Sequence, residues 1–504
     1  MIKKARAEKN GSKIYFCLLI LILGVAAFLR LYNFPYRYGL GEETVRDAVI
    51  GIEAARELQL PLTGAFSSLG PFTFGPLYAY QLALATLIFR SVYSPWIYLT
   101  LVSILYVWVI YKVGKMLLGK EFGLLLAFFA AISPPQIISA THLTSHNLTN
   151  IFAILAVWLF LTLLEKTRSN WWGLILGITI GIGLNLHYQM IGLLILPLLL
   201  VSAKKKNWPY LITALTGIFI TFVPLLIFEL NNHWFNVRNM LDFVISGRKR
   251  IYVPNRWLFY VRDFWPGFWA DTFGIPLLLG KVTMLTSAAV LAVAYFRKKL
   301  TKPITFLLIA FLVNFVILRY YWGERFYGYL NFLRPYVFIF TGYSFYFLGL
   351  QKFGKYAALI LLVAFTVLPL PRIRHDLARD SFSQTMLEQA DQAEQKLGNT
   401  KYQIYDCGLT YEGAYNAKVL AQVFLAELHQ KFSPSEAKIG LWRQGCRYPK
   451  ALLPPEKQYP RLNEMEMTDL TSATEETLRE AGWRAVSFRI VYDQYARWWF
   501  QLQP

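Results

Sequence analysis

The stretch that decides the fold runs from residue 171 to residue 203 and reads WWGLILGITIGIGLNLHYQMIGLLILPLLLVSA. It is almost wholly apolar, and it is longer than the roughly 20 residues that one membrane-spanning helix needs. Polar residues interrupt it at Asn185, His187 and Gln189. A hairpin of two short spans, with its tip at the outer face, explains both the length and the interruption. The sequence therefore predicts a helical membrane protein with polar side chains at a membrane surface.

Comparable apolar runs occur along most of the chain. Of its 504 residues, 56% are hydrophobic and 16% are charged, and the mean hydropathy is +0.38. A soluble protein of this composition would lack the polar side chains that cover a surface in water. We therefore expect a polytopic α-helical membrane protein with about 11–13 transmembrane helices. The other apolar runs lie near residues 14–32, 73–90, 96–114, 121–138, 150–165, 209–229, 274–296, 304–321, 330–350 and 354–371.

The net charge of +21 is concentrated in the short links between these runs, near residues 115–120, 166–170, 204–207, 297–303 and 351–355. Cytoplasmic loops carry such an excess of lysine and arginine, so we expect these links and the basic N-terminus in the cytoplasm. The loops near 139–149, 230–273 and 322–329, and the region after 372, should then lie outside. The charge needs no phosphate-binding face to explain it, so nucleic acid is not an expected partner.

The order of the first spans contains a conflict. Residues 14–32 lack a small-residue cleavage pattern, so we interpret them as a retained span that delivers residues 33–72 to the outer face. Two apolar runs, 73–90 and 96–114, then precede a cytoplasmic link. One of these two runs is therefore expected not to cross, which leaves about eleven crossings.

The character of the chain changes after Arg372. We expect a membrane domain over residues 1–375 and a small soluble α/β or α+β domain over 376–504, outside the membrane. Helical stretches are predicted at 383–397 and 413–431, and strands at 402–405 and 485–488. Cys407 and Cys446 form a disulfide if this domain is exported, or remain two buried thiols; both alternatives stay open.

Carboxylates cluster in the first outer loop, in the stretch YGLGEETVRD at residues 38–47. If residues 43–58 are helical, Glu43 and Asp47 share one helix face, with Arg46 close by. A neighbouring carboxylate raises a carboxyl pKa and an arginine lowers it, so Glu42, Glu43 or Asp47 can remain a competent base. The alternative is an amphipathic helix that lies on the membrane without chemistry.

Further polar residues are predicted at the outer face. His146 and Asn147 suit the orientation of a sugar or phosphate, and His142 with His146 suits a metal if both lie on one helical face. His187, Tyr188 and Gln189 form the hairpin tip, where interhelical hydrogen bonds are the alternative to a ligand.

Two cations oppose the usual charge bias. Arg325 and Arg334 flank the last outer loop, so they are candidates for holding an anionic ligand. Arg248, Lys249 and Arg250, followed by many aromatics, suit a lipid phosphate and a sugar ring, or an ordinary interfacial belt.

The order of these motifs resembles the GT-C superfamily of membrane glycosyltransferases, in particular the branch of protein mannosyltransferases and lipid A aminoarabinose transferases. The resemblance spans residues 14–370. It rests on the acidic motif, on Gly75-Pro76-Leu77-Tyr78 at a helix start, on residues 145–148, on the hairpin tip and on residues 325–335. The family usually has Asp at its catalytic position, whereas the acidic motif here begins Glu42-Glu43, which leaves open which carboxylate acts.

The resemblance implies transfer of a sugar from a polyprenyl-phosphate donor to an acceptor hydroxyl at the outer face of the plasma membrane. Glu42 or Glu43 would be the general base, and Asp47 would orient it. The residues implied for the donor phosphate are Arg46, His187, Arg325 and Arg334, and those implied for the acceptor or sugar are His146, Asn147, Tyr188 and Gln189. The acceptor can be a lipid, a glycan or a protein, and a divalent metal is a possible cofactor.

A lipid-linked glycan flippase or transporter is the alternative to an enzyme. It would explain the spans and the interfacial cations equally well. Transporters usually place binding charges near the midplane and contain internal repeats, whereas the carboxylates here lie in an outer loop. A third possibility, an enzyme that joins whole glycans, differs only in its acceptor.

Overall fold

The structure is a computed structural model of the whole chain. It describes residues 2–67, 72–91, 93–165, 168–246, 256–321, 325–351, 354–378, 381–398, 400–407, 421–423, 425–426, 437–443, 446, 465–492 and 498–503. These residues pack into two compact units. The first unit comprises residues 1–34, 62–81 and 96–378, and the second comprises residues 35–61, 82–95 and 379–504. The division into a membrane domain ending at residue 375 and a soluble domain beginning at residue 376 stays a prediction.

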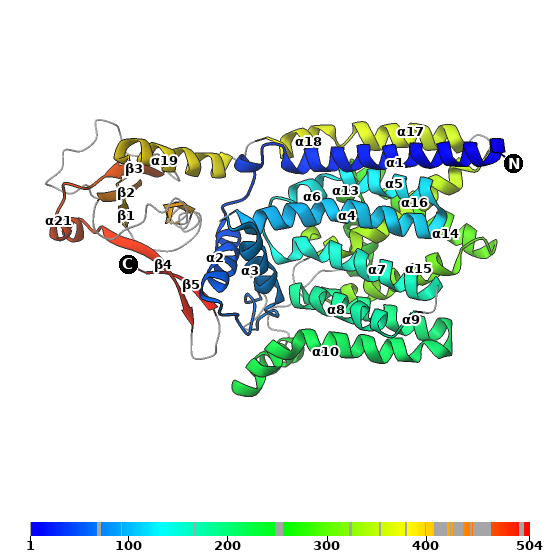
Figure 1. Cartoon of the computed structure of the whole chain (residues 1–504), viewed down its shortest axis with the longest axis horizontal. Helices are drawn as coiled ribbons and strands as arrows, with labels where there is room; N and C mark the ends of the chain where they lie inside the picture. The colour runs from blue at the N-terminus through cyan, green and yellow to red at the C-terminus, as the bar shows by residue number, and fades with distance from the viewer. Residues whose placement is uncertain are drawn as a thin grey trace. The chain divides into compact units, whose positions relative to one another are not determined.

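The first unit is a bundle of apolar helices that run side by side (Figure 1). Seven helical segments are long and apolar enough to cross a membrane, and three shorter apolar helices accompany them, among the described residues. The polytopic helical fold class is therefore confirmed. The main helices are α1 (Ile2–Leu31), α4 (Ser94–Leu118), α5 (Lys120–Ile132), α7 (Thr149–Glu165), α8 (Trp171–Leu186), α9 (Ile195–Ala203), α10 (Trp208–Asn231), α14 (Leu277–Phe296), α15 (Lys302–Arg319), α16 (Arg334–Gly349), α17 (Gly354–Val367) and α18 (Leu370–Asp376).

Helix α3 (Leu77–Phe89) accounts for the conflict in the order of the first spans. It has 13 residues, which at about 1.5 Å per residue span about 20 Å. The hydrocarbon core of a bilayer is about 30 Å thick. Helix α4, by contrast, has 25 residues. Of the two runs in question, α3 is therefore the one too short to cross.

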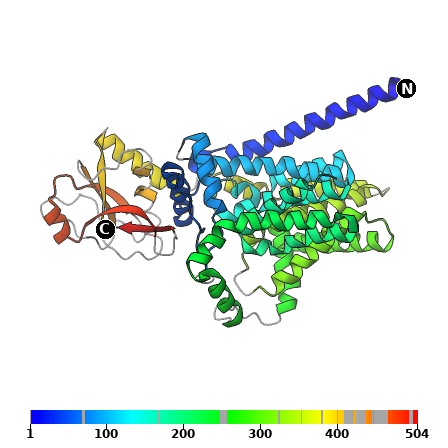
Figure 2. The same ribbon diagram turned by 60° about the horizontal axis from the view of Figure 1, so that its bottom comes forward.

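The predicted hairpin is present as α8, the 3₁₀-helical turn η3 (Tyr188–Leu194) and α9. Helix α8 packs closely along α10, because Gly177 lies directly against the backbone of Ala214 and leaves no room for a Cβ. Such small residues let two membrane helices approach closely. Figure 2 shows α1 diverging from the other helices of the bundle toward its N-terminus, which agrees with its largely exposed side chains.

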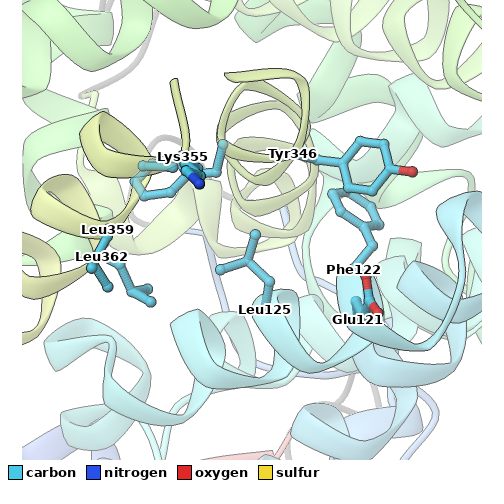
Figure 3. Close-up of a pocket in the computed structure, with 9 residues that line it drawn as sticks. Glu121, Phe122, Leu125, Tyr346, Lys355, Leu359 and Leu362 are labelled. Carbon is cyan, nitrogen blue, oxygen red and sulfur yellow. The ribbon is translucent and has the colours of Figure 1, made fainter. Parts of the chain in front are cut away.

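Shorter elements connect the long helices of the first unit. The predicted run 121–138 is divided at Ser133-Pro134, because Pro134 begins a new helix, α6. A cavity lies between α5, α16 and α17 (Figure 3). The connecting elements are α6 (Pro134–Ile138), η2 (Ser145–Leu148), η4 (Lys205–Asn207), α11 (Phe235–Ser246), α12 (Arg256–Phe259), η5 (Tyr260–Phe264), α13 (Trp265–Phe273) and η6 (Tyr327–Leu333).

The second unit combines part of the first loop with the C-terminal region. After the short turn η1 (Phe34–Tyr36), α2 (Glu42–Glu57) packs against the second half of α3, where Gly51 lies against Leu82. The hydroxyl of Ser383 in α19 (Ser381–Leu397) donates to the carbonyl oxygen of Tyr38 at 3.1 Å.

The C-terminal region contains a five-stranded mixed sheet in the order β3-β2-β1-β4-β5, in the part that is described. Strand β1 is central and buried along its whole length, as expected of a strand covered on both faces. It pairs in parallel with β2 and antiparallel with β4. The strands are β1 (Tyr402–Asp406), β2 (Ala437–Arg443), β3 (Met465–Asp469), β4 (Arg484–Tyr492) and β5 (Trp498–Gln503), and helix α21 (Glu475–Glu480) precedes β4.

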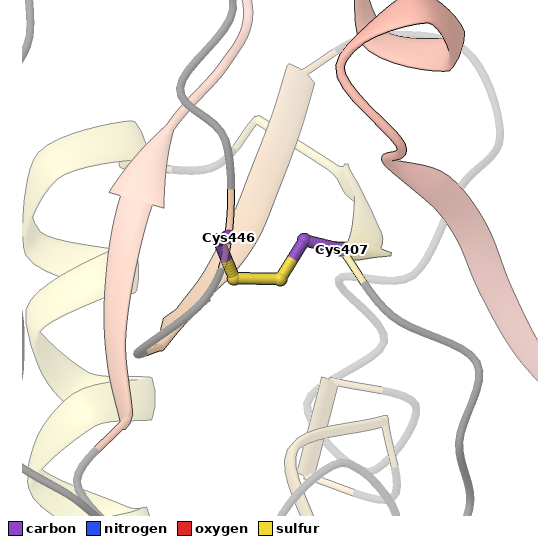
Figure 4. Close-up of a disulfide and its surroundings, with 2 residues drawn as sticks. All are labelled: Cys407 and Cys446. Carbon is purple, nitrogen blue, oxygen red and sulfur yellow. A yellow bond between two sulfur atoms is a disulfide. The ribbon is translucent and has the colours of Figure 1, made fainter.

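This region confirms the predicted strands at 402–405 and 485–488 and the helix at 383–397. The helix predicted at 413–431 lies mostly outside the described residues. A disulfide joins Cys407 to Cys446 (Figure 4), with their Cα atoms 5.5 Å apart. Of the two alternatives for these cysteines, the structure has the disulfide.

Candidate active site

The acidic motif forms the first turns of helix α2 in the second unit. Glu42 begins the helix, and its side chain lies outside the described part of the structure. Glu43 is exposed, and among the described residues it has no hydrogen-bond or ion-pair partner. Acidic side chains in a first helical turn are stabilised by the backbone N–H groups that lack partners there. Among the side chains that are described, the helix therefore presents the free carboxylate of Glu43 at its start.

Asp47 lies one turn further along the same helix, as the sequence predicted. It is buried, and the Arg46 guanidinium contacts its carboxylate through Nε at 2.9 Å and Nη2 at 2.8 Å. Burial raises the pKa of Asp47, Arg46 opposes this, and the charge of Glu43 raises the pKa further. Arg46 is thus held beside Asp47, and its assignment to a donor phosphate stays a prediction.

Histidines and aromatics form a stack in the first unit. The ring of His187 lies between Phe74 and Tyr329, with ring centroids 5.4 Å and 5.0 Å away. His146 meets the edge of Tyr329 at 5.4 Å, and its Nε2 lies 3.2 Å from the Thr144 hydroxyl. The chain therefore brings His146 from η2 and His187 from the hairpin tip to one aromatic ring of η6.

The burial of His187 limits what it can do. Burial lowers its pKa to about 4, so the ring is neutral at pH 7. Its Nδ1 accepts a hydrogen bond from the Gln189 backbone N–H at 3.4 Å. A neutral imidazole can donate one hydrogen bond to a phosphate but brings no positive charge to it.

The predicted metal pair His142 and His146 does not have the required geometry. The interpretation needed both residues on one helical face, but His142 lies in a bend before the 3₁₀ turn that contains His146. The described residues also contain no group of three or more His, Cys, Asp or Glu that could hold a metal ion.

Tyr188 belongs to a buried hydrogen-bond network that sequence reasoning missed. Its hydroxyl donates to the carbonyl oxygen of Thr73 at 2.7 Å. The Thr73 backbone N–H donates to Asn236 Oδ1 at 2.9 Å. Glu229 accepts from the backbone N–H groups of Asn236 and Val237, at 3.1 Å and 3.3 Å. Glu229 thereby fixes the start of α11. Asn236 at that helix start holds Thr73, which precedes Phe74 in the chain.

Arg334 is the centre of a second network. Its Nη2 pairs with Asp271 at 2.8 Å, its Nη1 donates to Thr272 and its Nε donates to Asn331. Arg372 approaches the other oxygen of Asp271 at 2.9 Å. Burial alone would raise the pKa of Asp271, but the two arginines outweigh it and hold the pKa below its usual value. With its donors engaged, Arg334 acts as a structural residue.

Asn147 continues the same network. Its Oδ1 accepts from Asn331 at 2.9 Å, and its Nδ2 donates to the carbonyl oxygen of His142 at 2.7 Å. Both ends of the amide are therefore used within the protein. Asn147 links η2 to η6 and is poorly placed to bind a sugar.

Arg325 has the opposite environment. Its guanidinium lies over Tyr260 at 5.0 Å, and its Nη2 donates to the carbonyl oxygen of Arg319 at 3.3 Å. Burial and the charges of Arg256 and Arg319 lower the pKa of Arg325. Among the described residues no carboxylate pairs with these three arginines. Within the described part of the chain, three cations therefore lie close together without a carboxylate partner.

Two of these arginines carry buried donors without partners. The Nε and Nη1 atoms of Arg319 and of Arg325 are buried and make no hydrogen bond within the described part of the chain. Arg319 is held over the ring of Trp257, with its guanidinium carbon 4.7 Å from the ring centroid. Buried polar groups nearly always have partners, so this cluster points to an anionic ligand. Sequence reasoning selected Arg325 but missed Arg256 and Arg319.

Gln189 lies at the same small cavity as Arg325. A cavity of about 10 Å³, room for about one water, is lined by Gln189, Tyr260 and Arg325. The Oε1 atom of Gln189 is buried without a partner. The hairpin tip and the last outer loop thus meet at a small, mainly apolar cavity that Gln189 and Arg325 line.

The predicted residues therefore divide between the two units. The first unit brings together His146, His187, Gln189 and Arg325, while Asn147 and Arg334 are committed to hydrogen bonds within the fold. Glu43, Arg46 and Asp47 belong to the second unit. Arg248, Lys249 and Arg250 lie outside the described residues.

Comparison with known proteins supplies the context for this arrangement. The family described as dolichyl-phosphate-mannose-protein mannosyltransferase matches residues 73–228, which include α3, the hairpin and the start of its hydrogen-bond network. Among curated proteins, none matches the chain significantly.

Solved structures of similar fold extend over most of the chain. ArnT from Cupriavidus metallidurans in the apo state is 12% identical with a TM-score of 0.55, over 86% of this chain and 94% of ArnT. The same protein bound to undecaprenyl phosphate gives 14% identity and a TM-score of 0.52, over 85% and 93%. The chain has the GT-C fold.

The Archaeoglobus fulgidus oligosaccharyltransferase in the apo form is a longer protein. This GT-C chain spans 59% of its length, at 16% identity and a TM-score of 0.47 over 75% of this chain. The family match covers residues 73–228, and the similarity to ArnT is one of fold.

Proposed function

We propose that this enzyme transfers a sugar from a polyprenyl-phosphate donor to a hydroxyl of its acceptor at the outer face of the membrane. The observation that carries the proposal is the cluster of Arg256, Arg319 and Arg325, with which no carboxylate pairs among the residues that the structure describes. Several unopposed guanidinium groups suit a phosphate, which accepts charge-assisted hydrogen bonds. Undecaprenyl phosphate is the ligand in the ArnT complex of similar fold, which supports the choice of a lipid phosphate.

The leaving group explains why cations matter more than an acid. In the proposed step, the oxygen of the acceptor hydroxyl bonds to C1 of the sugar, and the bond between C1 and the phosphate oxygen breaks. The electron pair of that bond stays on polyprenyl phosphate, and the acceptor proton goes to the base. The phosphate needs neutralisation of its growing charge, not protonation, so Arg319 and Arg325 can stabilise it without a general acid.

Glu43 is the proposed base. It is exposed and has no partner among the described residues, whereas Asp47 is buried and held by Arg46. A free carboxylate can accept the acceptor's proton directly. Asp47 would then act as a positioning residue that holds Arg46 beside the base. Glu42 remains the second candidate by position.

Polar side chains of the hairpin tip would complete the donor site. Gln189 has a free Oε1 beside Arg325, so it can accept a hydrogen bond from a sugar hydroxyl. The neutral ring of His187, stacked between two aromatics, is suited to donating one hydrogen bond. We propose that these two residues contact the sugar or the phosphate. His146 packs against Tyr329, the same ring on which His187 stacks.

Release of polyprenyl phosphate tests the function. Purified protein in detergent is incubated with a panel of radiolabelled polyprenyl-phosphate sugars and membrane-derived acceptors, and free polyprenyl phosphate is measured. Glu43→Gln should reduce release by roughly 10²–10⁴-fold, as expected for loss of a general base. Glu53→Gln is the matched control, because Glu53 lies on the same helix and pairs with Arg56.

The outcomes separate the enzyme from the transporter. Sugar-dependent release that Glu43→Gln abolishes and Glu53→Gln retains supports the proposal. Translocation of an intact lipid-linked glycan in vesicles, without any release, would make the chain a flippase and would overturn it. Full release by Glu43→Gln would move the base to Glu42 or Asp47.

A further inference from the structure

A second cavity lies in the membrane unit between helices α5, α16 and α17. Its volume is about 310 Å³, at the lower end of the roughly 300–1,000 Å³ of ligand sites. The walls are mainly apolar, with Phe122 and Leu125 from α5, Phe345 from α16, and Leu359 and Leu362 from α17. None of the residues discussed for sugar transfer lines it.

The side of the cavity formed by α17 faces hydrocarbon. Half of the residues of this helix are exposed, including Leu359, Ile360 and Val363 with exposed fractions of 58%, 68% and 54%. In a chain of this class, exposed leucine, isoleucine and valine on a spanning helix contact acyl chains. The cavity therefore lies where a lipid chain can enter it from the bilayer.

Two opposite charges line the cavity. Glu121 stands at the start of α5 and Lys355 at the start of α17, and in the view of Figure 3 Leu125 lies between them. They do not pair with each other, and no ion pair holds either one within the described residues. The carboxylate of Glu121 accepts a hydrogen bond from the Tyr15 hydroxyl at 2.6 Å, and the Lys355 ammonium lies 4.9 Å from the Tyr356 ring centroid.

This pattern selects one kind of amphiphile. An anionic headgroup would suit Lys355 but would meet the charge of Glu121, and a cationic headgroup would have the reverse difficulty. A headgroup that carries both charges satisfies both side chains. A primary ammonium, unlike a trimethylated one, also donates hydrogen bonds to a carboxylate. The walls below the charges accept an acyl chain, which gains about 0.8 kcal/mol for each buried CH₂ group.

We propose that this cavity binds one zwitterionic aminophospholipid of the phosphatidylethanolamine type. Its phosphate contacts Lys355, its ammonium contacts Glu121, and one acyl chain lies along Leu125 and Leu359. The lipid belongs to the leaflet at the end of the bundle where Lys120 and Lys355 begin their helices. It is a bound structural lipid of the membrane unit and takes no part in sugar transfer.

Lipid retention by the full-length protein tests this site. Protein purified and delipidated in detergent is incubated with phosphatidylethanolamine, phosphatidylcholine or phosphatidylglycerol of identical chains, and retained lipid is measured by native mass spectrometry. The ethanolamine lipid should be retained at least tenfold better than the other two and should raise the Tm of the protein. Glu121→Gln and Lys355→Gln should each remove that preference.

Two further variants keep the test decisive. Leu125→Trp fills the cavity without changing a charge, and it should lower retention of all three lipids to the level of unspecific binding. Lys302→Gln, at the start of α15 in another basic link, is the matched control and should retain the preference. Equal retention of the three lipids, preference for the anionic lipid, or an unchanged preference in Leu125→Trp would each overturn the proposal.

Discussion

Arg325 and Arg334 are close in sequence but should respond oppositely to the same substitution. Arg325→Gln removes charge-assisted hydrogen bonds to the donor phosphate, which are worth about 1.5–3 kcal/mol. Since about 1.4 kcal/mol corresponds to a tenfold change, the KM for the lipid donor should rise by roughly 10- to 150-fold.

The stability of Arg325→Gln should not fall. The substitution removes two buried donors without partners, each costing about 1–3 kcal/mol, and it relieves repulsion from Arg256 and Arg319. It loses the contact with the Tyr260 ring, worth about 0.5–2 kcal/mol, and the hydrogen bond to the carbonyl oxygen of Arg319, worth about 1.5–3 kcal/mol. These effects largely offset each other, so the Tm should stay the same or rise.

Arg334→Gln is the matched comparison. Arg334 is 2% exposed and pairs with Asp271, and breaking a buried pair from one side costs about 3–5 kcal/mol. Its Tm should fall clearly. The assay combines donor titration of polyprenyl phosphate release with thermal unfolding followed by tryptophan fluorescence. If Arg325→Gln lowers the Tm as much as Arg334→Gln and leaves the donor KM unchanged, the assignment of Arg325 to the phosphate is refuted.

Three further predictions concern stability and pH. Asp271→Asn should lower the Tm as Arg334→Gln does, and the double variant should cost less than the sum, because both disrupt one buried pair; additive effects would contradict the network. Cys407→Ser should destabilise the C-terminal region by about 3–4 kcal/mol, so limited proteolysis of this region should be faster in the variant. Reducing agent should accelerate proteolysis of the wild type and have no further effect on the variant. Burial raises the folded-state pKa of Asp47 above the ordinary 3.8, so the folded state binds a proton there more tightly than the unfolded state. The stability that this bound proton provides is lost as pH rises through the raised pKa. The Tm of Asp47→Asn relative to wild type should therefore increase with pH above about 4; a difference that is constant with pH would contradict the burial of Asp47.

The helices were predictable because apolar length is a local property. A run such as 209–229 has to be buried in hydrocarbon or protein, and it appears as α10 within a few residues. The division of 121–138 at Pro134 also has a local cause, since proline begins a helix readily but interrupts one. Strands β2, β3 and β5 were missed, because their short mixed sequences form strands only through pairing: β2 pairs with β1, β3 with β2, and β5 with β4.

The site was predictable only in its residue types. The polar tip at His187 and Gln189 stood out because polar residues are rare inside apolar runs. What each does depends on contacts distant in sequence. Asp271 was not selected, yet it is what engages Arg334. The pair His142 and His146 suggested a metal site through its spacing alone, and the bend at His142 removed the helix on which that spacing depended.

The two arginine environments also explain how a membrane protein can keep a phosphate site ready without a ligand. A carboxylate beside Arg325 would hold it firmly but would compete with the phosphate, as Asp271 would for Arg334. Aromatic faces attract a guanidinium weakly and compete with no anion. Trp257 under Arg319 and Tyr260 under Arg325 can therefore orient two cations while their Nε and Nη1 donors make no hydrogen bond among the described residues. The aromatic residues of α12 and η5 are thus as necessary to the proposed donor site as the arginines, and Tyr260→Leu should raise the donor KM although it removes no charge and no phosphate contact.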